Sequence, residues 1–260
     1  MTAIARFESR MRVRGTVVLT GAFVVLSGFM LVVFPAMAEE AEAIERAFPD
    51  HAAALFGFEA LHTIEGFVGS YMFPFIWVLM LGVYFGYIGG GLIAGDIRER
   101  RMDLTLANPV SRESVLAQKL LGLWVPIVSI NLVLYIVLLG GARLLGETLD
   151  PVTLGMAHLL SIPYVLVCAA IGLLFSVVLS RPETAQMTAL GAVFLLWLID
   201  GLSEMDPNLE WIGALTPSRY FDPTAILVHE SFAWGDAAIL LASFVILTGL
   251  ATLLFIRRDI

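Results

Sequence analysis

Long apolar runs alternate with short charged connections along the chain. A helix needs about 20 apolar residues to cross the hydrocarbon core of a bilayer, which is roughly 30 Å thick. Six runs of this kind predict membrane-spanning helices, over residues 15–37, 70–94, 120–139, 154–179, 184–199 and 237–256. The fifth run is the shortest, and its 16 residues reach only about 24 Å as a helix. That helix must therefore thin the bilayer or continue into the residues that follow it.

Three connections are long enough to have structure of their own. Residues 38–69 are acidic at first and then apolar, which favours a helix lying along the outer surface of the membrane that the chain spans. Residues 201–236 mix acidic residues with apolar patches and contain three prolines that mark turns. This second segment is a candidate for short pieces that dip back into the membrane, where loose backbone must be covered by protein or water. The third connection, residues 95–119, is charged.

Composition agrees with a membrane protein. Charged residues make up 15% of the chain and hydrophobic residues 59%, whereas soluble domains carry about 25% charged residues. A single cysteine excludes a disulfide framework and a CxxC zinc site, and the net charge of −8 argues against a nucleic-acid partner. The first apolar run is too long for the core of a cleaved signal peptide, so we expect it to be a retained span.

The charges of the connections predict an orientation. With the N-terminus in the cytoplasm, six spans place twelve Lys and Arg residues inside and three outside. Asp and Glu distribute in the opposite sense, seven inside and sixteen outside, which gives net charges of +5 and −13. Because cytoplasmic connections carry the excess of Lys and Arg, we expect a multi-pass protein of the cytoplasmic membrane with both termini in the cytoplasm.

The charged connection, "GDIRERRMDLTLANPVSRESVLAQK", has a pattern of its own. Polar residues with interspersed apolar ones predict a short amphipathic helix over 96–107, with a favourable pair between Asp96 and Arg100. Asn108-Pro109 predicts the end of this helix and the start of the next, with Asn108 as the N-cap and Pro109 in the first helical position. Two interpretations remain open, a solvated loop that obeys the charge rule or a docking element for a cytoplasmic partner.

This segment resembles the cytoplasmic loop of ABC type-2 permeases, the membrane subunits of one large class of ABC transporters. The matching residues are Glu99, Leu104, Leu106, Pro109, Val110, Ser111, Arg112, Leu116 and Lys119. The resemblance extends to the chain length, the six spans, the "LTPSRYFDP" stretch before the last span and the closing "FIRRDI". One departure is Arg101-Met102, where the family often has Gly-Thr.

The resemblance implies an all-α, type V-exporter-like bundle of six helices, with residues 1–260 as a single permease domain. It also implies export of a substrate, a second permease copy in a homodimer or heterodimer, and a separate ATPase subunit that binds ATP and Mg²⁺. The implied contacts to that ATPase subunit are Asp96, Arg98, Glu99, Arg100, Arg101, Asp103, Leu104, Pro109, Ser111 and Arg112. The N-terminal piece Arg6–Arg14 resembles an interfacial helix, although a basic anchor on anionic lipid fits as well.

The chain itself carries no G-x-x-x-x-G-K-[ST] motif, so we expect no P-loop hydrolysis, no catalytic residues and no bound cofactor in this chain. The alternative is a motor-independent secondary carrier or a structural membrane protein. Ion-coupled carriers typically keep charged residues inside their spans, and the predicted spans are almost free of them.

Other candidate chemistry is weaker. His158 and Ser161 in the fourth span raise the question of an intramembrane serine protease, but no G-x-S-x-G surrounds a serine. His51, His62 and His229 are predicted on the acidic outer side, yet their spacing matches no metal-ligand motif, and we expect no metal site. A final set of residues forms a small-residue face that suits close packing in the bundle or dimer, or part of a substrate path; it consists of Gly82, Gly86 and Gly90.

Overall fold

A computed structural model of the chain describes residues 3–47 and 60–258. Within these residues the chain forms helices and turns, with no strand. Six helical stretches are long and apolar enough to cross a membrane: Ile4–Ala41, Ile64–Arg98, Arg112–Leu144, Pro151–Val178, Pro182–Ser203 and Trp234–Arg257. Each of them contains one of the six predicted runs or nearly all of it, so the predicted all-α polytopic architecture is confirmed.

Two of these stretches, Ile64–Arg98 and Arg112–Leu144, are built from several helical segments. The helical segments of the described residues are α1 (Ala3–Ala47), α3 (Ile64–Gly66), the π-helices η1 (Phe67–Met72) and η2 (Pro74–Leu81), α4 (Gly82–Gly91), α5 (Ala94–Arg98), α6 (Arg101–Leu106), α7 (Arg112–Leu121), α8 (Trp124–Leu144), α9 (Pro151–Val178), α10 (Pro182–Ser203), α11 (Glu210–Gly213), the 3₁₀ turn η3 (Ser218–Tyr220), α12 (Pro223–Leu227) and α13 (Trp234–Arg257).

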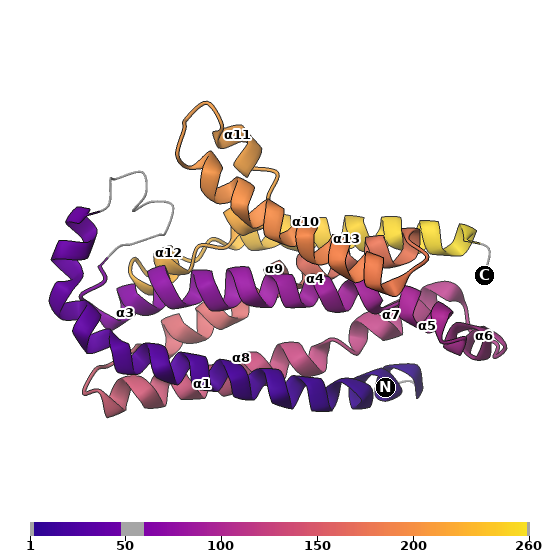
Figure 1. Cartoon of the computed structure of the whole chain (residues 1–260), viewed down its shortest axis with the longest axis horizontal. Coiled ribbons are helices and arrows are strands. Elements are labelled where there is room, and N and C mark those ends of the chain that lie inside the picture. Colours follow the sequence, from indigo (N-terminus) through magenta and orange to yellow (C-terminus); the bar gives the residue numbers. More distant parts are fainter. Residues whose placement is uncertain (1–2, 48–59, 259–260) are drawn as a thin grey trace.

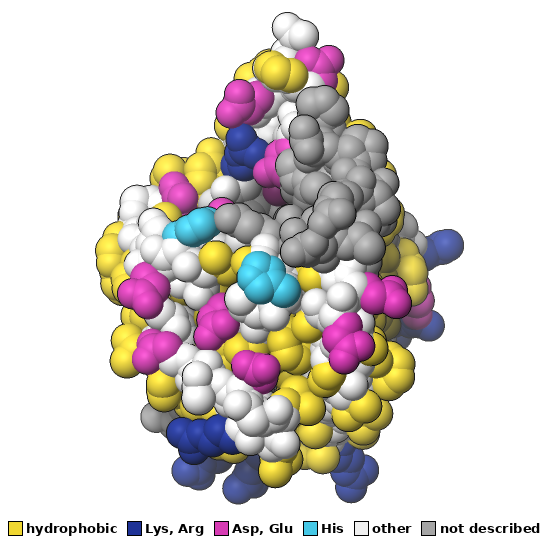
Figure 2. Space-filling model, turned by 90° about the vertical axis from the view of Figure 1, so that its left-hand side faces the viewer, with side chains coloured by type: hydrophobic (Ala, Val, Ile, Leu, Met, Phe, Trp, Pro, Cys, Tyr) yellow, Lys and Arg dark blue, Asp and Glu magenta, His cyan; other side chains and the backbone are white. Residues whose placement is uncertain are grey.

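The long helices lie side by side along the long axis of the molecule (Figure 1). Both chain ends lie at one end of this bundle together with α5, α6 and α7, and we call it the proximal end. α3 and α12 lie at the opposite, distal end, where acidic side chains are spread over the surface (Figure 2). α10 leans away from the other helices and carries α11 at its far end.

α9 is the central helix of the bundle. Of its most apolar stretch of 18 residues, 72% is buried inside the protein. In the corresponding stretches of α10 and α13, only 17% is buried. α4 packs against both α9 and α10, and α13 packs against α9. The outer faces of α10 and α13 therefore remain available for lipid or for another protein.

The three glycines singled out in the sequence lie at these helix contacts. A Cβ atom on Gly86 would lie 2.8 Å from Val193 Cγ2, and one on Gly90 would lie 2.7 Å from the Cα atom of Gln186, both in α10. A Cβ atom on Gly82 would lie 2.5 Å from the hydroxyl oxygen of Tyr164 in α9, which donates a hydrogen bond of 2.6 Å to the carbonyl of Val78. In the structure, these small residues thus allow close packing within one chain.

The ends of several helices differ from the predicted runs. α10 has 22 residues and so reaches about 33 Å, which removes the length problem of the fifth run because the helix continues through Ser203. α1 has 45 residues and includes Arg6–Arg14 without a break, so a separate interfacial helix is not found. Residues 48–59, which hold much of the expected outer surface helix, lie outside the described residues.

The distal connection before α13 folds back onto the bundle. Ile226 and Leu227 of α12 are buried, and α12 packs against η1 and α9. A Cβ atom on Gly69 in η1 would lie 3.2 Å from the carbonyl oxygen of Pro223, which shows how closely the two backbones approach. The apolar patch around α12 is therefore covered by protein, whereas Trp211 and Leu215, from the other apolar patch of this connection, are 67% and 72% exposed.

Candidate functional site

The charged segment at the proximal end is broken in two places. Arg100 has a φ of +56°, in the left-handed region, and separates α5 from α6. The single helix predicted over 96–107 is therefore wrong, and so is the predicted pair between Asp96 and Arg100, because the turn at Arg100 carries that side chain away. Asp96 pairs instead with Arg101, whose Nε donates a hydrogen bond of 3.0 Å to Asp96 Oδ1.

The corner after α6 also differs from its prediction. The N-cap of α7 is Ser111, whose Oγ accepts a hydrogen bond of 3.3 Å from the backbone N–H of Ser114. Asn108 instead closes the preceding helix, since its side-chain amide donates a hydrogen bond of 2.9 Å to the carbonyl of Leu104. The second helix consequently begins at Arg112 and not at Pro109. We call residues 94–111, with α5, α6 and this corner, the proximal element.

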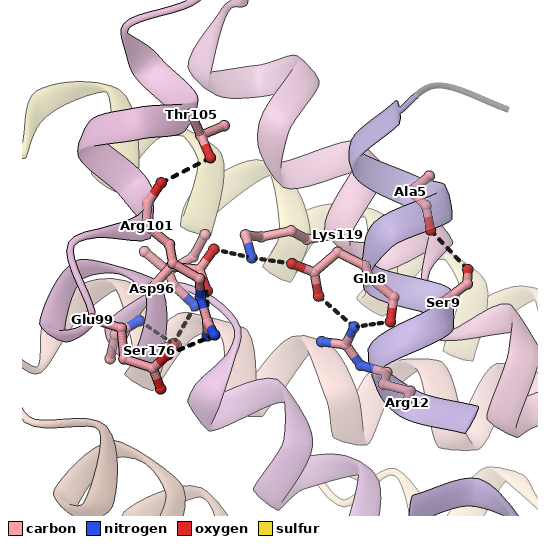
Figure 3. A network of polar contacts seen from close by, with 12 residues as sticks. Ala5, Glu8, Ser9, Arg12, Asp96, Glu99, Arg101, Thr105, Lys119 and Ser176 are labelled. Carbon is pink, nitrogen blue, oxygen red and sulfur yellow. Dashed lines mark hydrogen bonds and ion pairs between the residues drawn. The ribbon is translucent and has the colours of Figure 1, made fainter. Parts of the chain in front are cut away.

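A buried ion network joins the proximal element to α1 and α7 (Figure 3). The ammonium group of Lys119 lies 2.6 Å from Glu8 Oε1 and also pairs with Asp96 Oδ2. Lys119 is 2% exposed, Glu8 5% and Asp96 7%. The three residues come from α7, α1 and α5, so one lysine holds three separate segments in register.

Arginines complete the pairing of the two buried carboxylates. Arg12 pairs with Glu8 one helical turn away, and Arg101 pairs with Asp96 at 2.9 Å and with Glu99 at 2.5 Å. Each buried carboxylate therefore has two cationic partners. Buried ion pairs add little net stability but strongly penalise any arrangement that separates them, so this network fixes the position of the proximal element.

Arg112, the first residue of α7, contacts the end of the last spanning helix. Its Nη1 donates hydrogen bonds to the carbonyls of Phe255 at 2.8 Å, Ile256 at 3.1 Å and Arg258 at 2.5 Å. Its guanidinium also lies over the Phe255 ring, 5.6 Å from the centroid. The Phe255 carbonyl also accepts a hydrogen bond of 3.3 Å from the backbone N–H of Arg258. All three carbonyls lie at or just beyond the C-terminal end of α13, where few donors remain within the helix, so Arg112 caps α13.

Arg258 caps the end of α9 in turn. Its guanidinium donates hydrogen bonds of 3.3 Å to the carbonyls of Ser176 and Leu179, and it also contacts the carbonyl of Val177. From the same turn of α9, the Ser176 hydroxyl accepts hydrogen bonds from the backbone N–H groups of Ile93 at 2.9 Å and Ala94 at 3.0 Å. These last two residues lie at the break between α4 and α5.

The predicted contact residues separate into two groups. Asp96, Arg101 and Arg112 point inward and are paired within the chain, as described above. The others are exposed to solvent: Arg98, Glu99, Arg100, Asp103, Leu104, Pro109 and Ser111. Leu104 is 73% exposed although it is apolar, whereas Met102 in the same helix is fully buried and anchors α6.

Sequence reasoning missed the roles of Glu8, Ser176 and Arg258, and it treated Lys119 only as part of the family pattern. Lys119 and Glu8 are 111 residues apart in the chain, so no local pattern connects them. One usable signal was that Lys119 is the single lysine of the sequence and comes shortly after the apolar residues of a predicted helix, where a charged side chain needs a partner.

A second polar cluster lies inside the bundle and includes the suspected protease pair. The side-chain oxygen of Asn131 contacts Trp77 Nε1 at 3.1 Å and His158 Nδ1 at 3.0 Å, and Ser161 Oγ lies 3.3 Å from it. The Asn131 side-chain NH₂ donates to the carbonyl of Ile127, which fixes the orientation of the amide. The Asn131 oxygen can only accept, so Nδ1 of His158 must be the donor to it. Ser161 donates to the backbone carbonyl of His158 at 2.7 Å, and its hydroxyl is not oriented toward a ring nitrogen that acts as a base.

Metal coordination finds no support in the described part of the chain. Within residues 3–47 and 60–258, no group of three or more His, Cys, Asp or Glu side chains is arranged to hold a metal ion. His62 and His229 are exposed, and His51 lies outside the described residues.

Comparison with protein families gives one match. The model of the family described as "ABC-2 family transporter protein" matches residues 2–260, which is the whole chain apart from its first residue. No curated protein matches the chain. The six spanning helices and this match together show that the chain is a multi-pass membrane component of a transporter and belongs to the ABC-2 family.

Proposed function

We propose that this chain is the permease subunit of an ABC exporter of the cytoplasmic membrane, driven by ATP hydrolysis in a separate nucleotide-binding subunit. Family membership supports the role in transport. The observation that carries the coupling to ATP hydrolysis is the proximal element, whose exposed surface is held in place by the buried Lys119 network. ATP and Mg²⁺ would bind to the partner subunit.

The exposed surface of the proximal element suits contact with another protein. Leu104 projects from α6 with 73% of its surface exposed, and Asp103 and Pro109 are exposed near it. An isolated solvated loop has no reason to be fixed by a fully paired buried network. A docking element does, because a force applied at α6 reaches the spans only if the element itself does not yield.

The proximal end fits the cytoplasmic side of the membrane. It holds both termini and the proximal element, and by sequence this is the side with the excess of Lys and Arg. A second permease copy, identical or related, would pack against the exposed apolar face of α10. Large exposed side chains in the distal half of that face include Phe194, Leu195 and Leu198.

The docking interface can be tested by copurification. The chain is tagged after Ile260, native membranes are solubilised in mild detergent, and the purified material is examined for a P-loop ATPase in roughly equal amount. Leu104→Glu places a charge in the proposed contact. Leu144→Glu makes the same change at a residue that is 90% exposed at the distal end and serves as the matched control.

We expect the native chain and the Leu144→Glu variant to retain the ATPase and the Leu104→Glu variant to lose it, with all three eluting as folded protein. Failure of the native chain to retain an ATPase in several mild detergents would instead favour a motor-independent carrier. Equal retention by the Leu104→Glu variant would move the docking surface away from α6.

A further inference from the structure

Arg112 connects the proximal element to a helix that lies far from it in sequence. We propose that Arg112 is the positioning residue through which movement of the proximal element reaches α13 and, by way of Arg258, α9. This inference rests on the proposed function, because it concerns the path by which a docked ATPase would act on the spanning helices. The three carbonyl contacts of Arg112 at the end of α13 provide the first link.

Three contacts form a closed ring around the proximal element. At its start, the backbone N–H groups of Ile93 and Ala94 are held by Ser176 of α9. At its end, Arg112 holds α13, and Arg258 joins α13 back to α9. A displacement of the proximal element therefore acts on α9 and α13 together.

Each link of the ring involves backbone groups at a helix end or a helix break. Such groups lack partners within the helix, and a guanidinium bonded to them forms charge-assisted hydrogen bonds next to the negative end of the helix dipole. A bond to the backbone moves the whole helix, whereas a bond to a side-chain tip is absorbed by rotation of that side chain. The ring is thus suited to rigid transmission.

The proximal element itself holds α8 and α10 weakly, although α4, which leads into it, packs closely on α10 at Gly90. Arg98 of α5 pairs with Glu183 of α10, but their side chains are 58% and 63% exposed, and exposed pairs of this kind hold position weakly. α7 is separated from α8 by a break between Leu121 and Trp124, with Pro126 in the first turn of α8. We therefore expect α8 and α10 to move relative to the proximal element while α9 and α13 follow it.

Distances between spin labels test this inference directly. Ala117 on α7 is exposed, Leu253 on α13 is 57% exposed and Met187 on α10 is 59% exposed. Label pairs at 117–253 and 117–187 are introduced into the full chain, in which the single native cysteine, Cys168, is buried. Distance distributions are measured for the purified chain alone and for its complex with the ATPase, without nucleotide and with trapped nucleotide.

In the chain alone, we expect a narrow 117–253 distribution that broadens in Arg112→Ala and in Arg258→Ala. Because Arg112 holds α13 directly and Arg258 holds it by way of α9, the two residues act in parallel on this distance, and the double variant should broaden it more than either single variant. Arg112→Lys keeps the charge, and the width of its 117–253 distribution should lie between those of Arg112→Ala and the native chain. Arg98→Ala removes a guanidinium from the same end of the bundle and should leave the distribution unchanged.

In the complex, trapped nucleotide should shift the 117–187 distance but not the 117–253 distance, and Arg112→Ala should abolish this difference. The inference is overturned if the Arg112→Ala variant, folded and still bound to the ATPase, keeps a narrow 117–253 distribution. The inference is also overturned if Arg98→Ala broadens that distribution as much as Arg112→Ala does. Failure of the proposed function would appear separately, as absence of the ATPase, and the measurement on the chain alone does not depend on it.

Discussion

Gly172 of α9 lies directly against the backbone of α4. A Cβ atom at this position would lie 2.1 Å from the carbonyl oxygen of Gly86 and 2.7 Å from the backbone nitrogen of Gly90. Neither atom belongs to a side chain that can rotate away, so a methyl group there must push the helices apart. Small residues have this role at many contacts between membrane helices.

We predict that Gly172→Ala destabilises the protein by about 1–3 kcal/mol, the usual cost of an overpacked core. The matched control is Gly191→Ala in α10, where a Cβ atom has no neighbour within 4 Å. Alanine is favoured over glycine in helices by about 1 kcal/mol, so the control should be neutral or slightly stabilising. Thermal unfolding followed by size-exclusion chromatography in detergent distinguishes the two, and equal midpoints would contradict the close contact.

The Lys119 network gives a second prediction for a single residue. Lys119→Met leaves Glu8 and Asp96 buried without their shared cation, which should cost about 3–5 kcal/mol, as for other broken buried pairs. Arg98→Met removes an arginine from the same end of the bundle, but from an exposed pair, and should cost at most about 1 kcal/mol. Denaturant titration of both variants checks this order, and a similar loss in both would show that the network does not hold the segments together.

The helices were predictable from sequence where a single apolar run determines them. All six spans follow from such runs, since about 20 apolar residues have no other stable environment. The exact ends were not predictable: α10 continues through the acidic Asp200 because that side chain is buried against the distal connection. The break at Arg100 was missed because Lys119 and Arg101 pull Asp96 inward, which is a tertiary effect that overrides the local pattern. The cap at Ser111 is a local signal, and it was missed because Asn108-Pro109 offered a competing helix start.

The central helix has a cap that depends on pH. Asp150 is the N-cap of α9, and its Oδ2 accepts a hydrogen bond of 2.7 Å from the backbone N–H of Thr153. This bond favours the charged form and lowers the pKa of the Asp150 carboxyl. Its contribution to stability is therefore complete above the ordinary Asp pKa of about 3.9 and is lost as the pH falls through the lower pKa of the folded state.

Asp150→Ala should thus lower the unfolding temperature at neutral pH, and this difference from the native protein should shrink in strong acid. Asp150→Asn retains a capping oxygen that does not titrate, so its advantage over Asp150→Ala should be the same at every pH. Melting curves between neutral and strongly acidic pH measure both differences. If the native protein keeps the same difference in unfolding temperature from Asp150→Ala below the lowered pKa, the carboxylate is not the source of the effect.

At the scale of the whole molecule, charge is divided between the two ends. The distal face carries acidic side chains over much of its surface (Figure 2), while the proximal end gathers the basic residues that lie beside the termini and in the proximal element. This division was predictable because it depends only on the order of spans and connections. The partners of individual charges were not predictable, since they come from helices far apart in sequence.

Two asparagines at opposite ends of the bundle test the orientation. Asn108 and Asn208 are both exposed, and Cys168 is buried and should give little background. In intact cells, a membrane-impermeant maleimide should label Asn208→Cys at once and Asn108→Cys only after the cells are permeabilised. Labelling of Asn108→Cys in intact cells would place the termini outside and would contradict the proposed docking of a cytoplasmic ATPase.

The packing of α4 has a consequence for the time course of biosynthesis. α4 ends at Gly91 and its main partner, α9, ends at Val178, so 87 further residues must be made before the pair is complete. At about 5–20 residues per second, this takes about 4–17 s. During that interval the glycine face of α4 has no partner from this chain, so the second span must wait in the bilayer or at the insertion machinery, and any pause in translation between these residues lengthens its exposure.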